Sequence, residues 1–139
     1  MKYSDENRGI IQDRKNFSRI RDFSGLKYGK ITPTDIDAII DFGNKAVVII
    51  ETKFGNSQMP LGQRIALERL ADTVDESGRR GLAIVASYNN QEGDIDFASA
   101  IVSEYRTCHR WKTTKNSLTV RELIDNFLEY HGLGEKYLG

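Results

Sequence analysis

The sequence predicts a mixed α/β fold built around a mixed β-sheet. Two apolar, β-branched runs at 46–53 and 82–86 are typical of strands buried on both faces. Between them, apolar residues recur at helical spacing from Pro60 to about Glu76. A second amphipathic helix is expected over 120–128. The predicted order of helix, three strands, helix, strand, and then strand and helix indicates an α/β layer fold with a mixed sheet.

Three further elements are expected before the first buried strand. Inward-facing apolar residues at helical spacing predict a helix over 8–22. A short strand is expected at 27–31, ended by the break around Pro33. Acidic and apolar residues alternate over 35–42, which indicates a strand that pairs with 46–53 across a turn at Gly43-Asn44.

The C-terminal part is expected to add one strand and one helix. Residues 99–106 form a plausible strand after the polar loop at 89–94. Thr119 and Glu122 have the spacing of a capping box, which starts the helix that closes near Gly132.

Composition limits the possible functions. The chain has 139 residues, with 20 Lys and Arg against 20 Asp and Glu, and 39% hydrophobic residues; this predicts one folded domain over 1–139. No unbroken apolar run exceeds the five residues of 46–50, which is too short to cross a membrane. The only cysteine, Cys108, cannot form an internal disulfide, which favours a reducing, cytoplasmic location. No glycine-rich phosphate loop is present, which argues against an ATPase or a nicotinamide enzyme.

The residues that could take part in metal binding or catalysis lie on the strands at 35–42 and 46–53. Asp37 is on the first strand, and Glu51 and Lys53 end the second. Two carboxylates side by side repel each other unless a cation joins them, and Mg²⁺ prefers such oxygen ligands. Lys53 lies two residues beyond Glu51 and therefore on the same face. The group predicts metal-assisted hydrolysis of a phosphodiester.

This hypothesis depends on the length of the turn between the strands. A two-residue loop pairs position 42 with 45 and turns Glu51 away from Asp37. A three-residue loop over 43–45 pairs 42 with 46, so that 37 lies opposite 51 and 35 opposite 53. The hypothesis therefore predicts the three-residue loop, or a bulge with the same effect.

These residues resemble the PD-(D/E)XK nuclease superfamily. The segment Thr34-Asp35-Ile36-Asp37 is followed by Glu51-Thr52-Lys53, fourteen residues after Asp37. The resemblance covers about 6–88 and implies a restriction-endonuclease-like core of helix, three strands, helix and strand, with 99–131 peripheral. It implies that Asp37, Glu51 and the Thr52 carbonyl hold Mg²⁺, which Mn²⁺ can replace. Lys53 would orient the attacking water or stabilise charge on the phosphoryl group.

Four further residues are candidates for this site. Asp35 competes with Asp37, because Pro33 precedes neither acid directly. Relatives that add an acid from the first helix imply Glu6 or Asp13. Relatives with a glutamine in the helix after the third strand imply Gln63, which could contact the attacking water or a phosphate; it could equally be an ordinary polar residue at a helix start.

The basic residues suggest a nucleic-acid partner. Residues 1–30 hold eight Lys and Arg against four acids, and a second basic cluster lies at 106–115 around Trp111. Candidate contacts are Lys15, Arg19, Arg110 and Lys112. The sequence thus predicts a Mg²⁺-dependent nuclease of DNA, with RNA not excluded, acting as a homodimer or with a partner protein. The alternative is a non-catalytic nucleic-acid-binding module or partner subunit that retains the nuclease fold.

Overall fold

The computed structural model describes residues 19–139 and divides the chain into two compact units, Met1–Pro33 and Thr34–Gly139. The larger unit is a mixed α/β structure with one five-stranded sheet in the order β1-β2-β3-β4-β5. Its elements are β1 (Ala38–Phe42), β2 (Ala46–Phe54), α2 (Leu61–Glu76), β3 (Arg80–Tyr88), β4 (Ile101–Thr107), β5 (Arg110–Lys112), α3 (Val120–Tyr130) and α4 (Gly134–Leu138). The mixed α/β class is therefore confirmed. The expectation of one domain over 1–139 stays a prediction.

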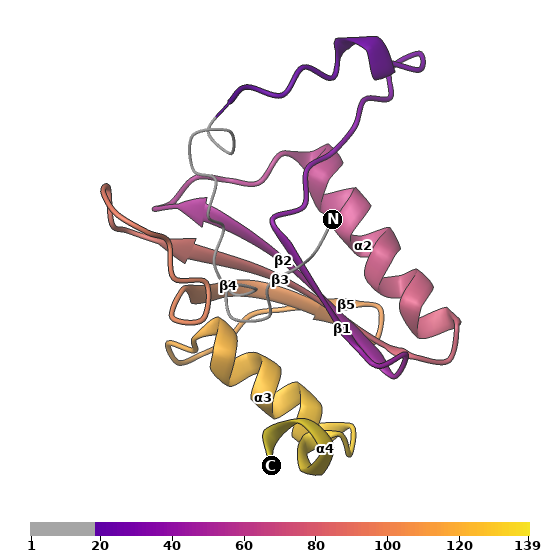
Figure 1. Ribbon diagram of the computed structural model, residues 1–139, viewed down its shortest axis with the longest axis vertical. Helices are drawn as coiled ribbons and strands as arrows, with labels where there is room; N and C mark the ends of the chain where they lie inside the picture. The colour runs from indigo at the N-terminus through magenta and orange to yellow at the C-terminus, as the bar shows by residue number, and fades with distance from the viewer. Residues whose placement is uncertain (1–18) are drawn as a thin grey trace, which may run out of the picture. The chain divides into compact units, whose positions relative to one another are not determined.

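The sheet is mixed because only β2 and β3 run parallel, joined by α2. The pairs β1–β2, β3–β4 and β4–β5 are antiparallel. Figure 1 shows α2 on one face of the sheet and α3 with α4 on the other. We call these the α2 face and the α3 face.

Each face of the central strands buries its own apolar cluster. On the α2 face, Ile49 and Val85 pack with Leu67 and Ala71 of α2. On the α3 face, alternate residues of β2 and β3 pack against α3, whose Phe127 and the rest of its apolar stripe are buried. This two-sided burial explains why both strands are continuous apolar runs in the sequence.

The helix α2 lies unusually close to the start of β3. A Cβ at Gly81 would collide with the Ala71 carbonyl oxygen of α2, so only glycine fits. The Gly81 N–H also donates to Asp75 Oδ1 at 2.8 Å. These contacts fix the C-terminal half of α2 against the sheet.

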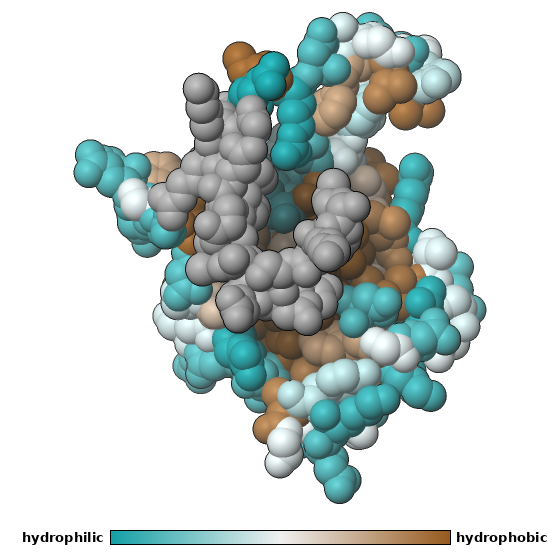
Figure 2. Space-filling view, viewed as in Figure 1, coloured by the Kyte–Doolittle hydropathy of each residue, from teal (hydrophilic) through white to brown (hydrophobic). Residues whose placement is uncertain are grey.

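The smaller unit differs from expectation. Residues 8–18 of the expected helix lie outside the described residues, and 19–22 are not helical. The expected strand at 27–31 is wrong: Tyr28 and Ile31 form a single bridge around a tight turn in which Gly29 has a φ of 64°. A 3₁₀ helix, η2 (Ser24–Leu26), precedes this turn. The segment exposes apolar side chains, seen as brown surface in Figure 2.

Other boundaries also differ from the expected ones. The strand expected at 35–42 begins only at Ala38, so in the described residues two strands, not three, precede α2. The strand expected at 99–106 is β4, at Ile101–Thr107. The helices over Pro60–Glu76 and 120–128 are confirmed, as is the Thr119–Glu122 capping box. In residues 19–139 no helix has the length and apolar character needed to cross a bilayer.

Candidate active site

The hairpin between β1 and β2 has the three-residue loop that the site requires. Phe42 pairs with Ala46 and Ala38 with Ile50. The loop backbone has positive φ at Gly43 and Asn44, and the Lys45 N–H donates to the Phe42 carbonyl at 2.9 Å. Continued by one residue beyond the last pair, this register brings Asp37 opposite Glu51. The predicted loop length is therefore confirmed.

Asp37 directly precedes β1, and it bonds to β2 through its side chain instead of its backbone carbonyl. Its Oδ2 accepts hydrogen bonds from the Thr52 N–H at 2.8 Å and the Thr52 hydroxyl at 3.1 Å. Its own N–H donates to Glu51 Oε2 at 3.3 Å. Both bonds from Thr52 use Oδ2 and do not occupy Oδ1. Because β1 starts at Ala38, the expected pairing of positions 35 and 53 does not form.

Glu51 is a buried carboxylate with only 3% of its surface exposed. Its Oε1 lies 3.3 Å from Lys53 Nζ. Burial raises the pKa of Glu51 above its usual value, and the negative charge of Asp37 raises it further, while Lys53 opposes the rise. The ionised form of Glu51 is thus under-compensated, and additional positive charge would stabilise it.

Gln63 brings α2 into the same site. It lies in the first turn of α2, and its Nε2 donates to the Asp35 carbonyl at 3.1 Å. Hydrogen bonding to Gln63 also opposes the raised pKa of Glu51. Its Oε1 is buried and accepts no hydrogen bond from the described residues. Asp35 itself is exposed and contributes its backbone to this contact.

The donor set fits a magnesium ion held by few protein ligands. Within residues 19–139, no group of three His, Cys, Asp or Glu side chains could hold a metal. Mg²⁺ is commonly bound by one or two carboxylates together with water and substrate phosphates. Asp37 and Glu51 supply two carboxylates. The Thr52 carbonyl points to the same strand edge as its N–H, which reaches Asp37.

Two of the expected nucleic-acid contacts lie on another strand of the sheet. Arg110 and Lys112 are exposed on β5, at the opposite edge of the sheet and three strands from β2. Arg19 is exposed in the smaller unit. Glu6, Asp13 and Lys15 lie outside the described residues.

Sequence reasoning missed a polar network on the α2 face at β4 and β5. Arg106 makes two bonds of 2.9 Å to the Asp72 carboxylate, and His109 Nδ1 lies 3.4 Å from the same group. Nearer the start of α2, Arg64 pairs with Glu104 and stacks 4.2 Å from the Trp111 ring centre. The members on α2 are four residues apart (Arg64, Glu68 and Asp72), a spacing that could have revealed one polar stripe.

Trp111 is part of that network. Its indole N–H donates to Glu68 Oε1 at 2.6 Å, and the ring packs with the α2-face cluster. The side chain therefore packs within the protein and is not a free platform for a base.

No protein-family model, no curated protein and no solved structure matches this chain. The nuclease resemblance therefore rests on the residues and their arrangement alone.

Proposed function

We propose that this protein is a Mg²⁺-dependent nuclease that hydrolyses phosphodiester bonds in DNA. The proposal rests on one observation: Asp37, Glu51 and Lys53 lie close together at the end of β2. Asp37 is hydrogen-bonded to β2, and Lys53 lies 3.3 Å from the buried Glu51 carboxylate. A buried acid beside a second acid is costly unless a cation completes the site.

In this proposal Asp37 and Glu51 hold the metal, with the Thr52 carbonyl as a further ligand. When bound, Mg²⁺ or Mn²⁺ supplies a Lewis acid for the phosphoryl oxygens. Lys53 is the protein's own cation at the site: with its side chain 23% exposed, it can reach a water or a phosphoryl oxygen while it remains beside Glu51.

Gln63 and Asp35 have supporting roles in the proposal. The Gln63 side chain hydrogen-bonds to the Asp35 carbonyl and to Glu51, and through Glu51 it would help to orient the attacking water. Asp35 is the second choice as an acid, because its carbonyl rather than its carboxylate makes the contact with Gln63.

The proposed fold is a restriction-endonuclease-like core. A hairpin, a helix and a strand parallel to the second hairpin strand support it, and here these are β1, β2, α2 and β3. In this proposal β4, β5 and the C-terminal helices are peripheral. A homodimer or a partner protein would supply the rest of the nucleic-acid surface.

The test is cleavage of linear, single-stranded, nicked and four-way-junction DNA, with a single-stranded RNA for comparison. Each reaction is run with Mg²⁺, with Mn²⁺ and with EDTA. Lys53→Ala is compared with Lys45→Ala, which alters an exposed lysine in the hairpin loop at the other end of β2. We expect metal-dependent cutting that Lys53→Ala abolishes and Lys45→Ala retains.

Two results would contradict the proposal. Cutting by the purified chain that survives both EDTA and Lys53→Ala would show that neither a metal nor Lys53 is required. Binding of DNA without cutting under any metal condition would favour the alternative, a nucleic-acid-binding module that keeps the fold without the activity. Such a module shows only salt-sensitive affinity.

A further inference from the structure

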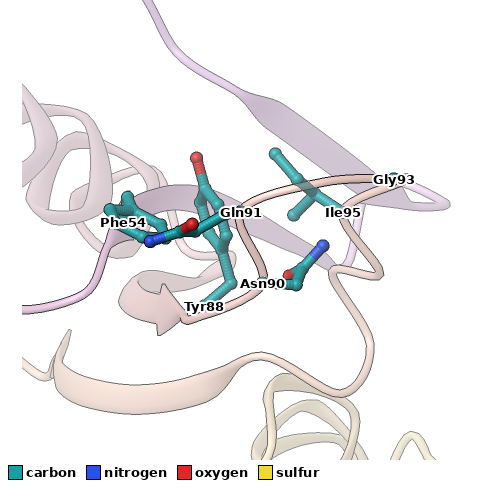
Figure 3. Close-up of a pocket in the computed structure, with 6 residues that line it drawn as sticks. All are labelled: Phe54, Tyr88, Asn90, Gln91, Gly93 and Ile95. Atoms are coloured by element: carbon teal, nitrogen blue, oxygen red, sulfur yellow. The ribbon is translucent and has the colours of Figure 1, made fainter.

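A pocket of about 390 Å³ lies beside the candidate active site, and sequence reasoning did not find it. Figure 3 shows the residues that line it: Phe54, Tyr88, Asn90, Gln91, Gly93 and Ile95. Its walls come from the ends of β2 and β3 and from the loop that follows β3. Ligands of α/β proteins commonly bind beyond the carboxyl ends of parallel strands, which is where this pocket lies.

The pocket is one residue away from the candidate active site along β2. Phe54 directly follows Lys53 and pairs with Tyr88, just as Lys53 pairs with Ser87. Side chains alternate along a strand, so Phe54 points to the α3 face and Lys53 to the α2 face. The two sites therefore lie on opposite sides of the same sheet end, with adjacent Cα atoms about 3.8 Å apart.

The lining offers an aromatic surface and amide groups. The Phe54 and Tyr88 rings meet edge to face with their centres 5.7 Å apart, and 42% of Phe54 is exposed. In Figure 3 the Gln91 side chain extends toward these rings. Asn90 stabilises the loop through its Nδ2, which donates to the carbonyls of Glu92 and Asp94, and these bonds do not use its Oδ1.

Charge restricts what this pocket can hold. All six lining residues are uncharged, but the loop around them carries Glu92, Asp94 and Asp96. A phosphate in the pocket would lie among these acids, whereas a neutral planar ring would not be repelled. An uncharged ring that stacks on aromatic side chains and hydrogen-bonds to amides is the chemistry of a nucleobase.

We propose that this pocket binds an unstacked base of a single-stranded segment whose phosphodiester lies at Glu51 and Lys53. The proposal rests on the proposed nuclease function and adds to it the class of substrate. The nucleic-acid backbone would pass from one face to the other around the end of β2, where even a Cβ added to Gly55 would meet no described atom within 4 Å. A base inside a duplex cannot enter without leaving its stack, so single-stranded or locally unpaired substrate is preferred.

The experiment places 2-aminopurine, one position at a time, along a single-stranded DNA of about 12 nucleotides, within the length that one small domain can contact. Fluorescence is measured on binding to the full chain in EDTA and again with Ca²⁺. The variants are Tyr88→Ala, Phe54→Ala and Gln91→Ala; the control is Leu70→Ala, an α2 residue with 40% exposure, close to that of Phe54. Thermal unfolding of each variant is followed in parallel, and Gln91→Ala alters only an exposed loop side chain.

We expect a fluorescence change confined to one or two neighbouring positions in the wild type and in Leu70→Ala. Tyr88→Ala and Phe54→Ala should weaken binding roughly tenfold, and Gln91→Ala should change the signal at the same positions. In cleavage assays the pocket variants should raise KM on single-stranded DNA more than on duplex DNA.

Failure of this proposal and failure of the proposed function give different results. Metal-dependent cutting that needs Lys53, together with a 2-aminopurine signal that is uniform along the strand or unaffected by all three variants, overturns the pocket and keeps the nuclease. A position-specific signal that the pocket variants remove, without any cutting, supports base binding and overturns the nuclease. No binding in either buffer overturns the pocket proposal.

Discussion

Two groups of charged residues lie under the same helix, on the α2 face, and they are built differently. At the end of β2, Glu51 is in contact with Lys53 at 3.3 Å and lies beside a second acid. Near the C-terminal half of α2, Asp72 receives two bonds of 2.9 Å from Arg106. Burial and Asp37 raise the pKa of Glu51, whereas hydrogen bonding to Arg106 lowers the pKa of Asp72.

The difference distinguishes a candidate ligand-binding site from an ion pair that stabilises the fold. A carboxylate whose ionised form is stabilised by the protein contributes to folding and needs nothing further. A carboxylate whose ionised form is left under-compensated costs stability, and such groups concentrate where a ligand completes the charge balance. The opposite pKa directions of Glu51 and Asp72 agree with the geometry of Asp37, Glu51 and Lys53, on which the choice of the candidate active site rests.

The largest expected effect is the loss of activity in Asp37→Asn. The amide oxygen can still accept the Thr52 hydrogen bonds, so the hairpin should fold, but the second negative charge is gone. We expect cleavage in Mg²⁺ to fall about 10²- to 10³-fold, measured under single-turnover conditions. Asp41→Asn, four residues along the same segment, is the control and should cut normally. Equal losses in both variants would mean that Asp37 has no special role.

Asp72→Asn should have the next largest effect, on stability. The substitution removes the negative charge that pairs with Arg106, whose side chain is 14% exposed. We expect the free energy of unfolding to fall by about 2 kcal/mol and the Tm by about 6 °C. The comparison is Asp125→Asn, which breaks the exposed Arg121 pair and should cost less than about 0.5 kcal/mol in urea unfolding. Similar losses would show that the Asp72 pair is no stronger than a surface pair.

The same pair predicts the direction of the acid dependence. The pKa of Asp72 in the folded chain is below its usual value of 3.8, chiefly because Arg106 hydrogen-bonds to the ionised form. Its contribution to stability is therefore complete above the unfolded pKa and is lost as the pH falls through the folded pKa. The stability difference between wild type and Asp72→Asn should be constant near neutral pH and shrink as the pH falls below 3.8. A stability difference between the two proteins that grows as the pH falls would contradict this prediction.

The smallest expected effect is a change in stability of opposite sign at two glutamates, Glu51 and Glu104. Glu51→Gln removes a buried charge that its neighbours only partly compensate, so it should raise the free energy of unfolding without metal by about 1 kcal/mol. Glu104 lies in the same row across the sheet, since Glu51 pairs with Val85 and Val85 with Glu104. Glu104→Gln breaks the pair with Arg64 and should lower stability. Changes of the same sign in chemical denaturation would remove the distinction between the two groups.

Much of this fold could be predicted because the central strands and both long helices are set by burial. The runs at 46–53 and 82–86 are apolar on both sides, and few other structures could bury them. The bridge around Gly29 resembles a strand in sequence, but one glycine with positive φ turns the chain within four residues. The strand β5 was missed because its turn uses positive φ at Cys108 and His109, which carry no glycine signal.

The site was predictable as a set of residues but not in its details. The Glu-x-Lys spacing and the expected register were enough to place Asp37 beside Glu51. The structure adds that Asp37 lies beyond the end of β1 and pairs with Thr52 through its side chain, which no alternation pattern could indicate. The aromatic pocket was missed because Phe54 and Tyr88 come from strands separated by a helix and meet only through the parallel pairing.

The hairpin loop at 43–45 has a consequence for how this chain can change. Surface loops usually tolerate insertions and deletions. Here the three-residue length fits the pairing of Phe42 with Ala46, and a pairing shifted by one residue would turn every β1 side chain to the opposite face. A Cβ at Gly43 would also lie 2.6 Å from the Tyr137 hydroxyl of α4. A loop with no catalytic group thus helps to set which side chains face the site, and a deletion there that shifts the pairing by one residue should be more damaging than the loss of most side chains around the site.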